Sequence, residues 1–181
     1  MSETSALTGT YAIDPSHSRL GFVVRHAMVT KVRGKFGDFD GTVTVDGANP
    51  SASSVSITAK MATIDTGDEG RDGHLRSGDF FDVEAHPTMT FTSTAITPAG
   101  DDEFTVSGDL TIRGVTKPVT IDLEYTGAAK DPFGNERIGF EGKAEINRKD
   151  WGLEWNAALE TGGILVGEKV KLELDISAIR S

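Results

Sequence analysis

The amino-acid sequence predicts an all-β protein whose strands form an antiparallel barrel or sandwich. The first observation is strict alternation near the C-terminus, where Val170, Leu172 and Leu174 are separated by charged residues. Successive side chains of a strand point to opposite faces, so this segment buries one face and exposes the other. The second observation is that similar apolar rows recur about eight times along the chain, which is typical of antiparallel barrels.

Length and composition indicate a single domain. The 181 residues suit one undivided barrel, and we expect a flexible N-terminus over residues 1–8 and one barrel domain over 9–181. The net charge of −10 argues against a nucleic-acid partner, which requires a basic surface. The absence of cysteine excludes disulfides and thiolate catalysis.

The sequence contains no signal for a membrane or for export. No apolar run approaches the ~20 residues that span a bilayer, so we expect no stable membrane insertion. The first residues lack the basic and apolar segments of a signal peptide, which predicts a cytoplasmic protein.

The first half of the chain provides the first strands. A short strand over 9–14 ends at Asp14-Pro15, and residues 28–34 are expected to form a loop or a short helix with a basic end. The apolar rows of this half are Leu20, Phe22, Val24 and His26; Phe39, Gly41, Val43 and Val45; and Val55, Ile57, Ala59 and Met61.

One short helix interrupts the alternation. The pattern stops between Asp65 and Phe81, where Asp68 suits an N-cap and Gly78 a C-terminal stop, so a helix is predicted near 69–77. Strands then resume over Phe104–Ile112 and Val119–Tyr125, and a turn follows at 131–135. The other two rows of this half are Met89, Phe91, Ser93 and Ala95; and Ile138, Phe140, Gly142, Ala144 and Ile146.

The interior of such a barrel is either filled by side chains or holds one small ligand. Small residues such as Gly41, Gly108 and Gly142 lie near the middle of their strands, where they would widen the bore. Glycine in a strand also marks bulges and bends, so a filled interior stays open as the alternative.

The polar residues form no recognisable catalytic or metal-binding set. His17, His26, His74 and His86 lack the dense spacing of metal ligands, and we expect no metal site and no catalytic residue. His26 shares the parity of Phe22, so it is interpreted as a core residue or as a polar contact for a ligand.

Several stretches together resemble the YceI-like, polyisoprenoid-binding family. The resemblance covers about residues 9–179 and rests on four blocks in order. They are Tyr11–Ser18 with Gly34–Gly41; Arg71–Leu75 with Asp79–Asp82 and His86-Pro87; Gly108–Val119; and Ile146–Arg148 with Trp151–Leu153 and Gly162–Val170.

The resemblance implies an extended lipocalin-like antiparallel β-barrel with a long apolar cavity. It also implies noncovalent binding of an isoprenoid lipid, such as a polyprenyl phosphate or an isoprenoid quinone, with no other cofactor, and it is compatible with a homodimer. The predicted cavity residues are Phe22, Val24, His26, Phe36, Phe39, Phe91 and Phe140. The predicted residues of the mouth and headgroup site are Arg71, Arg76, Phe80, Phe81 and Trp151.

Two other functions stay open on the sequence. One is an enzyme that acts on a prenyl or quinone headgroup, with His26, Asp72 or His74 as acid or base. The other is a barrel with a filled core that serves protein interaction. Carriage or sequestration of a lipid is favoured, because the polar residues assemble no triad, dyad or metal set.

Overall fold

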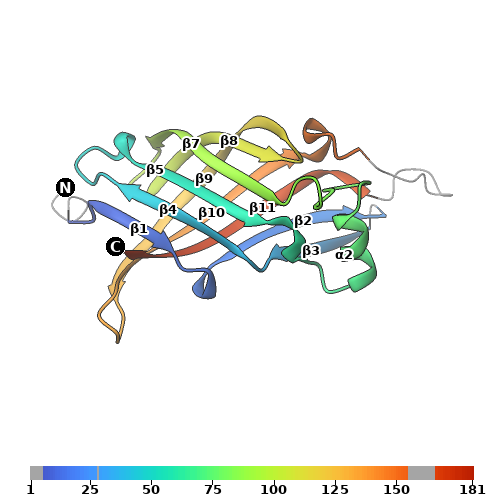
Figure 1. Cartoon of the computed structure of the whole chain (residues 1–181). Coiled ribbons are helices and arrows are strands. Elements are labelled where there is room, and N and C mark those ends of the chain that lie inside the picture. The colour runs from blue at the N-terminus through green and yellow to red at the C-terminus, as the bar shows by residue number, and fades with distance from the viewer. Residues whose placement is uncertain (1–5, 28, 155–165) are drawn as a thin grey trace.

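The computed structural model is one antiparallel sheet rolled into an elongated barrel (Figure 1). It describes residues 6–27, 29–154 and 166–181, and the side chain of His26 lies outside this description. The elements are β1 (Gly9–Ile13), η1 (Pro15–His17), β2 (Arg19–His26), β3 (Thr30–Phe36), β4 (Phe39–Val45), η2 (Pro50–Ala52), β5 (Ser54–Lys60), η3 (Met61–Thr63), β6 (Ile64–Asp65), α2 (Glu69–Arg76), β7 (Thr88–Pro98), β8 (Glu103–Ile112), β9 (Val115–Lys130), β10 (Glu136–Asn147), η4 (Arg148–Trp151) and β11 (Val166–Arg180).

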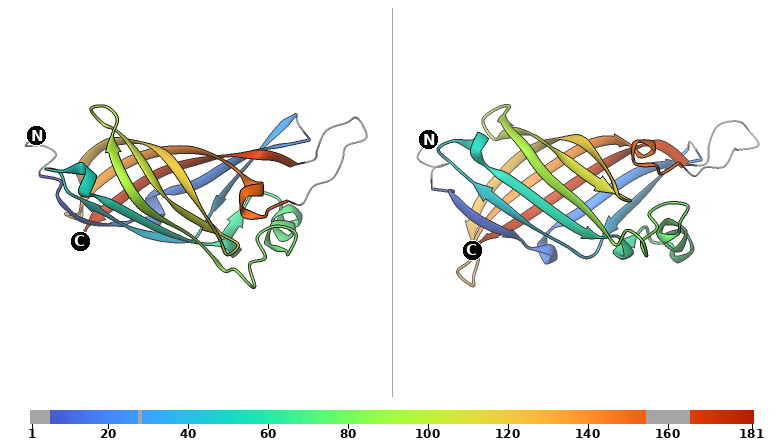
Figure 2. Two further views of the ribbon diagram at one scale, coloured as in Figure 1. Left: turned by 90° about the horizontal axis from the view of Figure 1, so that it is seen from above. Right: turned by 45° about the horizontal axis from the view of Figure 1, so that its top comes forward.

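The sheet closes because β11 pairs with both β10 and β1. In the described residues, the order β1-β4-β5-β7-β8-β9-β10-β11 and the β1–β11 pairing make a ring of eight strands. β2, β3 and β6 extend the sheet from β11 and continue the walls that β1, β4 and β5 begin. The predicted lipocalin-like barrel is therefore confirmed. β1 lies towards one end of the barrel and α2 lies at the other (Figure 2).

β11 changes its partner around Ser177. Its residues up to Asp175 pair with β2, and those from Ala178 pair with β1. At the change, the Asp14 N–H donates to the Ser177 carbonyl at 2.8 Å, and the Ser177 N–H donates to the Ser18 hydroxyl at 2.9 Å. The Asp-Pro-Ser-His-Ser segment thus kinks the wall while keeping these backbone groups paired.

Burial follows the predicted alternation along most strands. On β10, Ile138 is buried while Glu141 and Lys143 are exposed. The most buried apolar side chains of the core are Tyr11, Ala59, Met61, Val106 and Ala178. Withdrawal of this inward face from water is the main stabilising contribution to the fold.

The expectation of a loop or short helix over 28–34 is wrong for the residues that the structure describes. β3 begins at Thr30 and pairs with β2 along its whole length. Its inward row is Val32, Gly34 and Phe36, and the glycine in this row concealed the alternation. Lys31, Arg33 and Lys35 point to the outer face, since side chains of alternate parity leave a strand on opposite sides.

A bulge corrects the predicted row on β7. The register shifts between Ser93 and Ala95, so Ala95 is exposed and Ile96 faces the interior instead. A bulge adds one residue to a strand and reverses the parity beyond it.

The predicted helix is present and one residue shorter. Asp68 caps α2 by accepting the Arg71 N–H at 3.0 Å. The helix ends at Arg76, and its C-cap Ser77 donates to the His74 carbonyl through both its hydroxyl and its N–H, so Gly78 follows the C-cap as predicted. No helix among the described residues is long and apolar enough to span a membrane.

Candidate functional site

The barrel contains two apolar cavities. We call the cavity at the β1 end the terminal chamber; its volume is about 120 Å³. Asp46, Asp101 and Asp102 contribute to its lining beside apolar side chains. The apolar lining includes Leu7, Ile13, Val43, Val55, Ile96, Phe104, Tyr125, Ile138, Phe140 and Ile176.

The second cavity, the helix chamber, lies beneath α2 and has a volume of about 160 Å³. Leu75 on α2 and Phe80 and Phe81 after it cover this chamber. The other apolar residues of its lining include Leu20, Phe22, Val24, Phe36, Ala59, Met89, Leu110, Ile112, Val119, Ile146, Leu153 and Leu172. Both chambers are thus hydrocarbon-lined spaces inside the closed sheet.

The two chambers meet at four shared residues, which we call the waist: Ile57, Phe91, Ile121 and Leu174. They lie on β5, β7, β9 and β11. The adjacent strands β4, β8 and β10 carry the glycines Gly41, Gly108 and Gly142. A Cβ atom on Gly142 would lie 3.2 Å from Ile121 Cγ2 and 3.4 Å from Leu174 Cδ1.

The glycines do not widen the middle of the bore as predicted. The space that each glycine leaves is taken by a large side chain of an adjacent strand. The same holds at Gly41, where a Cβ would lie 2.8 Å from Ile13 Cδ1. Close packing favours this outcome, because an empty space beside apolar side chains forfeits dispersion contacts.

Aromatic rings form part of the wall of each chamber. The Phe22 and Phe36 rings lie 5.9 Å apart, and Phe36 and Phe81 lie 6.5 Å apart in an edge-to-face arrangement. Tyr125 and Phe140 lie 5.8 Å apart in the terminal chamber. These separations fall in the favourable range for aromatic pairs.

The predicted cavity residues fall into three groups. Phe22, Val24 and Phe36 line the helix chamber, Phe140 lines the terminal chamber and Phe91 lines both.

Phe39 lines neither chamber. Its side chain is 3% exposed and packs in the solid core, which corrects its predicted place. The side chain of His26 lies outside the described part of the chain.

The predicted mouth residues are also divided. Phe80 and Phe81 line the helix chamber, whereas Trp151 is a core residue rather than a residue of the opening. Trp151 is 2% exposed, and its indole N–H donates to the Leu110 carbonyl at 2.9 Å. An indole can be buried this deeply because its one donor is satisfied.

Arg71 and Arg76 line neither chamber and hold the α2 segment to the barrel. Arg71 donates to the Thr66 hydroxyl and to the Thr66 carbonyl, both at 2.7 Å. Arg76 donates to the Ala62 carbonyl at 3.2 Å and pairs with Glu69 at 3.3 Å. A headgroup role for either arginine would have to compete with these contacts.

Arg148 lines the helix chamber and is 4% exposed, although no role for it is predicted from the sequence. Its guanidinium donates to the carbonyls of Leu153, Val166 and Gly167. Burial lowers its pKa, and the nearby charge of Glu168 opposes this shift. The alternation could have indicated its inward orientation, because Arg148 follows Ile146 at the next even-numbered position of the inward row of β10.

Asp72 and His74, the proposed acid or base groups, are engaged outside the chambers. Asp72 is 3% exposed and accepts from the Thr66 N–H and hydroxyl. His74 Nε2 lies 2.9 Å from Asp79 Oδ2. Among the described residues, no group of three or more His, Asp or Glu side chains could hold a metal ion.

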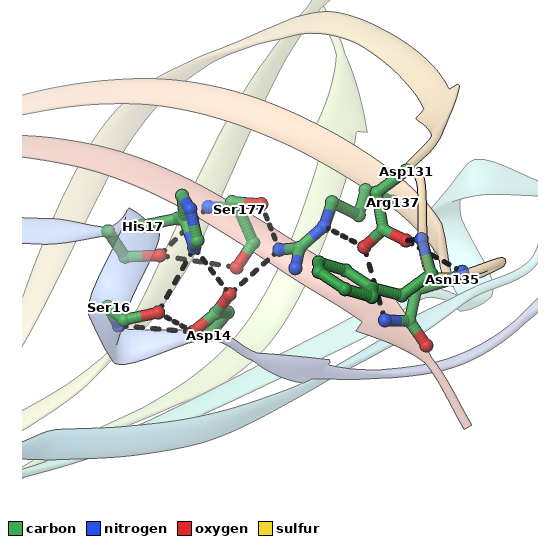
Figure 3. Close-up of polar contacts among 9 residues, drawn as sticks. Asp14, Ser16, His17, Asp131, Asn135, Arg137 and Ser177 are labelled. Atoms are coloured by element: carbon green, nitrogen blue, oxygen red, sulfur yellow. Dashed lines mark hydrogen bonds and ion pairs between the residues drawn. The ribbon is translucent and has the colours of Figure 1, made fainter.

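An ionic cluster outside the chambers joins distant parts of the barrel. Arg137 donates to Asp14 and to Asp131, each at 2.8 Å (Figure 3). Arg137 holds the pKa of Asp14 well below its usual range. Burial raises the pKa of Asp131, but hydrogen bonds from Arg137 and Asn135 outweigh it and lower the pKa to about 2. The cluster ties the kink after β1 to the β9–β10 turn.

His17 in this cluster lacks the arrangement of a catalytic triad. Its Nδ1 atom lies 3.0 Å from the Ser16 hydroxyl and 2.8 Å from Asp14. A serine–histidine–aspartate relay uses a different ring nitrogen for each partner. Here both contacts involve one nitrogen, so the imidazole cannot pass a proton between them.

Comparison with known proteins agrees with this architecture. Residues 11–178 match the model of the YceI-like domain. A UPF0312 protein from Ectopseudomonas mendocina is 40% identical over 177 residues, which are 97% of this chain and 90% of that protein.

Two solved structures share the fold. BcnA from Burkholderia cenocepacia has a TM-score of 0.81 at 26% identity, covering 91% of this chain and 98% of that one. A polyisoprenoid binding domain from Saccharophagus degradans, implicated in plant cell wall breakdown, has a TM-score of 0.72 at 18% identity. That likeness covers 94% of this chain and 98% of the other, and it shows the fold alone.

Proposed function

The chain belongs to the YceI-like family, and on that premise we propose that it binds an isoprenoid lipid noncovalently and carries or sequesters it. The chambers would hold the prenyl chain, and the headgroup would stay near an opening. The main support is the lining of the bore, where most of the contacting residues are aliphatic or aromatic.

The driving force is the removal of hydrocarbon from water. Each buried methylene contributes ~0.8 kcal/mol, so a five-carbon isoprene unit contributes roughly 3–4 kcal/mol before losses. A hydrogen bond adds only ~1 kcal/mol net. Ordering of the chain offsets part of the gain. The chain, rather than the headgroup, therefore supplies most of the affinity.

The size of the chambers suits such a ligand. An apolar cavity of roughly 150 Å³ in another protein admits benzene, a hydrocarbon about as large as one isoprene unit. The chambers measure about 120 and 160 Å³. The Saccharophagus degradans domain, whose fold this chain shares, is a polyisoprenoid binding domain, which supports the same ligand class.

The charges near the chambers favour one direction of insertion. Three acidic residues, Asp46, Asp101 and Asp102, line the terminal chamber, whereas the helix chamber has one acidic residue, Glu173, and one basic residue, Arg148. Negative charge repels an anionic headgroup. A phosphate would therefore be held at the α2 end of the barrel. A neutral quinone ring is not restricted in this way.

The test is direct. Native mass spectrometry of freshly purified protein should show a bound hydrophobic small molecule. After delipidation, geranylgeraniol should displace a fluorescent fatty acid from the bore. Failure of both measurements would refute the proposal. A lipid recovered in a chemically changed form would instead indicate an enzyme acting on the headgroup.

A matched pair of variants locates the binding. Leu172 lines the helix chamber, and its neighbour Lys171 lies on the outer face of β11. Leu172→Glu should weaken lipid binding, because a carboxylate would enter a hydrocarbon-lined space. Lys171→Glu should leave binding intact. Circular dichroism of both variants checks that the barrel still forms.

A further inference from the structure

We infer that Phe91 determines how long a prenyl chain the bore accepts, an inference that rests on the proposed function. The two chambers meet only through the waist, as far as the described residues show, and Phe91 is its single aromatic member. A ligand confined to one chamber does not contact the other. A longer chain must pass Phe91.

The position of Phe91 is set by its strand neighbours. It pairs with Ile57 on β5 and with Leu110 on β8, and its side chain is buried. Its ring lies over Gly108, where a Cβ atom would lie 2.7 Å from Phe91 Cε1 and closer still to Cζ. The ring is thus seated in the space that the glycine leaves, and the waist has a defined shape.

The size of each chamber limits what fits without passage through the waist. Each holds a hydrocarbon of about one isoprene unit by comparison with cavities that admit benzene. Chains of three or four units therefore extend across the waist if they are bound inside the barrel. Their affinity then includes displacement of Phe91 and its neighbours from their packed positions, a cost that shorter chains avoid.

The inference predicts a break in the dependence of affinity on chain length. Each methylene withdrawn from water is worth about a fourfold gain in affinity before chain ordering is subtracted. In the wild-type protein the gain should become smaller once the chain must cross the waist. Removal of the Phe91 ring joins the chambers, so the gain should continue for longer chains.

The experiment measures dissociation constants for prenol, geraniol, farnesol and geranylgeraniol by displacement of a fluorescent fatty acid. We compare the wild-type chain with Phe91→Ala and with Phe39→Ala, which removes a buried ring that lines neither chamber. The ratio of geranylgeraniol affinity to the affinity for prenol, a single isoprene unit, should rise about tenfold in Phe91→Ala, which is slightly less than the gain from two methylenes. This ratio should stay within about twofold in Phe39→Ala.

A second pair of variants protects the test against misfolding. Phe91→Leu should shift the ratio in the same direction by a smaller amount, and Phe91→Trp should lower it. An equal effect of the Phe91 and Phe39 substitutions, or no effect of either, overturns the role of Phe91 while leaving lipid binding in place. Absence of binding for every alcohol in the wild-type protein overturns the proposed function itself.

Discussion

Gly34→Ala should close part of the helix chamber by moving one ring. Gly34 pairs directly with Phe22 across β2 and β3. A Cβ atom at position 34 would lie 2.7 Å from Phe22 Cε1 and 2.9 Å from Cε2, where ordinary contact begins at 3.4 Å. Phe22 Cζ would lie closer still, and the three nearest atoms all belong to that ring, so the ring must move by more than about 0.7 Å. The chamber that Phe22 lines is the open space available to it.

The expected effect on binding follows from the volume lost. If the displaced ring excludes two or three methylenes, at ~0.8 kcal/mol each, affinity for geranylgeraniol falls by about 2 kcal/mol, or roughly 30-fold. Crowding should also lower the free energy of unfolding by about 1–3 kcal/mol. Displacement titration and urea unfolding measure the two quantities.

Two controls separate this mechanism from a general effect of alanine. Gly73 in α2 has nothing within 4 Å of an added Cβ, so Gly73→Ala should leave binding unchanged and slightly stabilise the helix. Phe22→Ala added to Gly34→Ala removes the clash and should restore much of the affinity. Wild-type binding by Gly34→Ala alone would refute the reasoning, as would a double variant that binds no better than the single one.

Three further predictions concern the polar groups of the wall. The free energy of unfolding should fall as the pH drops from about 4 towards 2, because Asp14 and Asp131 have lowered pKa values in the folded state, Asp131 to about 2, and stabilise it only while ionised. Chemical unfolding across this range should show a weaker pH dependence in Arg137→Met; an identical dependence contradicts the assignment. Arg148→Met should lower the unfolding free energy by about 3 kcal/mol, because three carbonyls lose their donor; unchanged thermal stability would exclude this. Trp151→Phe should lower the free energy of unfolding by about 1–3 kcal/mol, because the indole hydrogen bond to the Leu110 carbonyl is lost. Lipid affinity should stay unchanged in this variant; weaker binding would support the predicted place of Trp151 at the mouth.

Alternation was a reliable guide wherever the pleat stayed regular. The β10 row from Ile138 to Ile146 lies on the inner face as predicted, because period two leaves only two possible orientations for a strand. The same rule failed beyond Ser93, where a bulge reverses the parity and no residue type at that place predicts it. The alternation was also hard to see on β3, because Gly34 occupies one of the inward positions.

Polar side chains were harder to place than apolar ones. Arg71 and Arg76 were predicted at a mouth from their charge, and the structure uses both to hold the α2 segment. Arg148 received no role, although it lines the helix chamber. Burial of a charge depends on which backbone carbonyls the fold brings within reach of the side chain, and the alternation of residue types does not reveal these.

The sequence alone determined the class of the fold, the α2 helix and its N-cap, and the apolar character of the interior. These properties follow from local periodicity and capping chemistry, which act over a few residues. Tertiary structure decided where the bore stays open. Whether the space beside Gly108 or Gly142 is empty depends on which side chain of a neighbouring strand fills it, and strand register sets that neighbour over long separations in the chain.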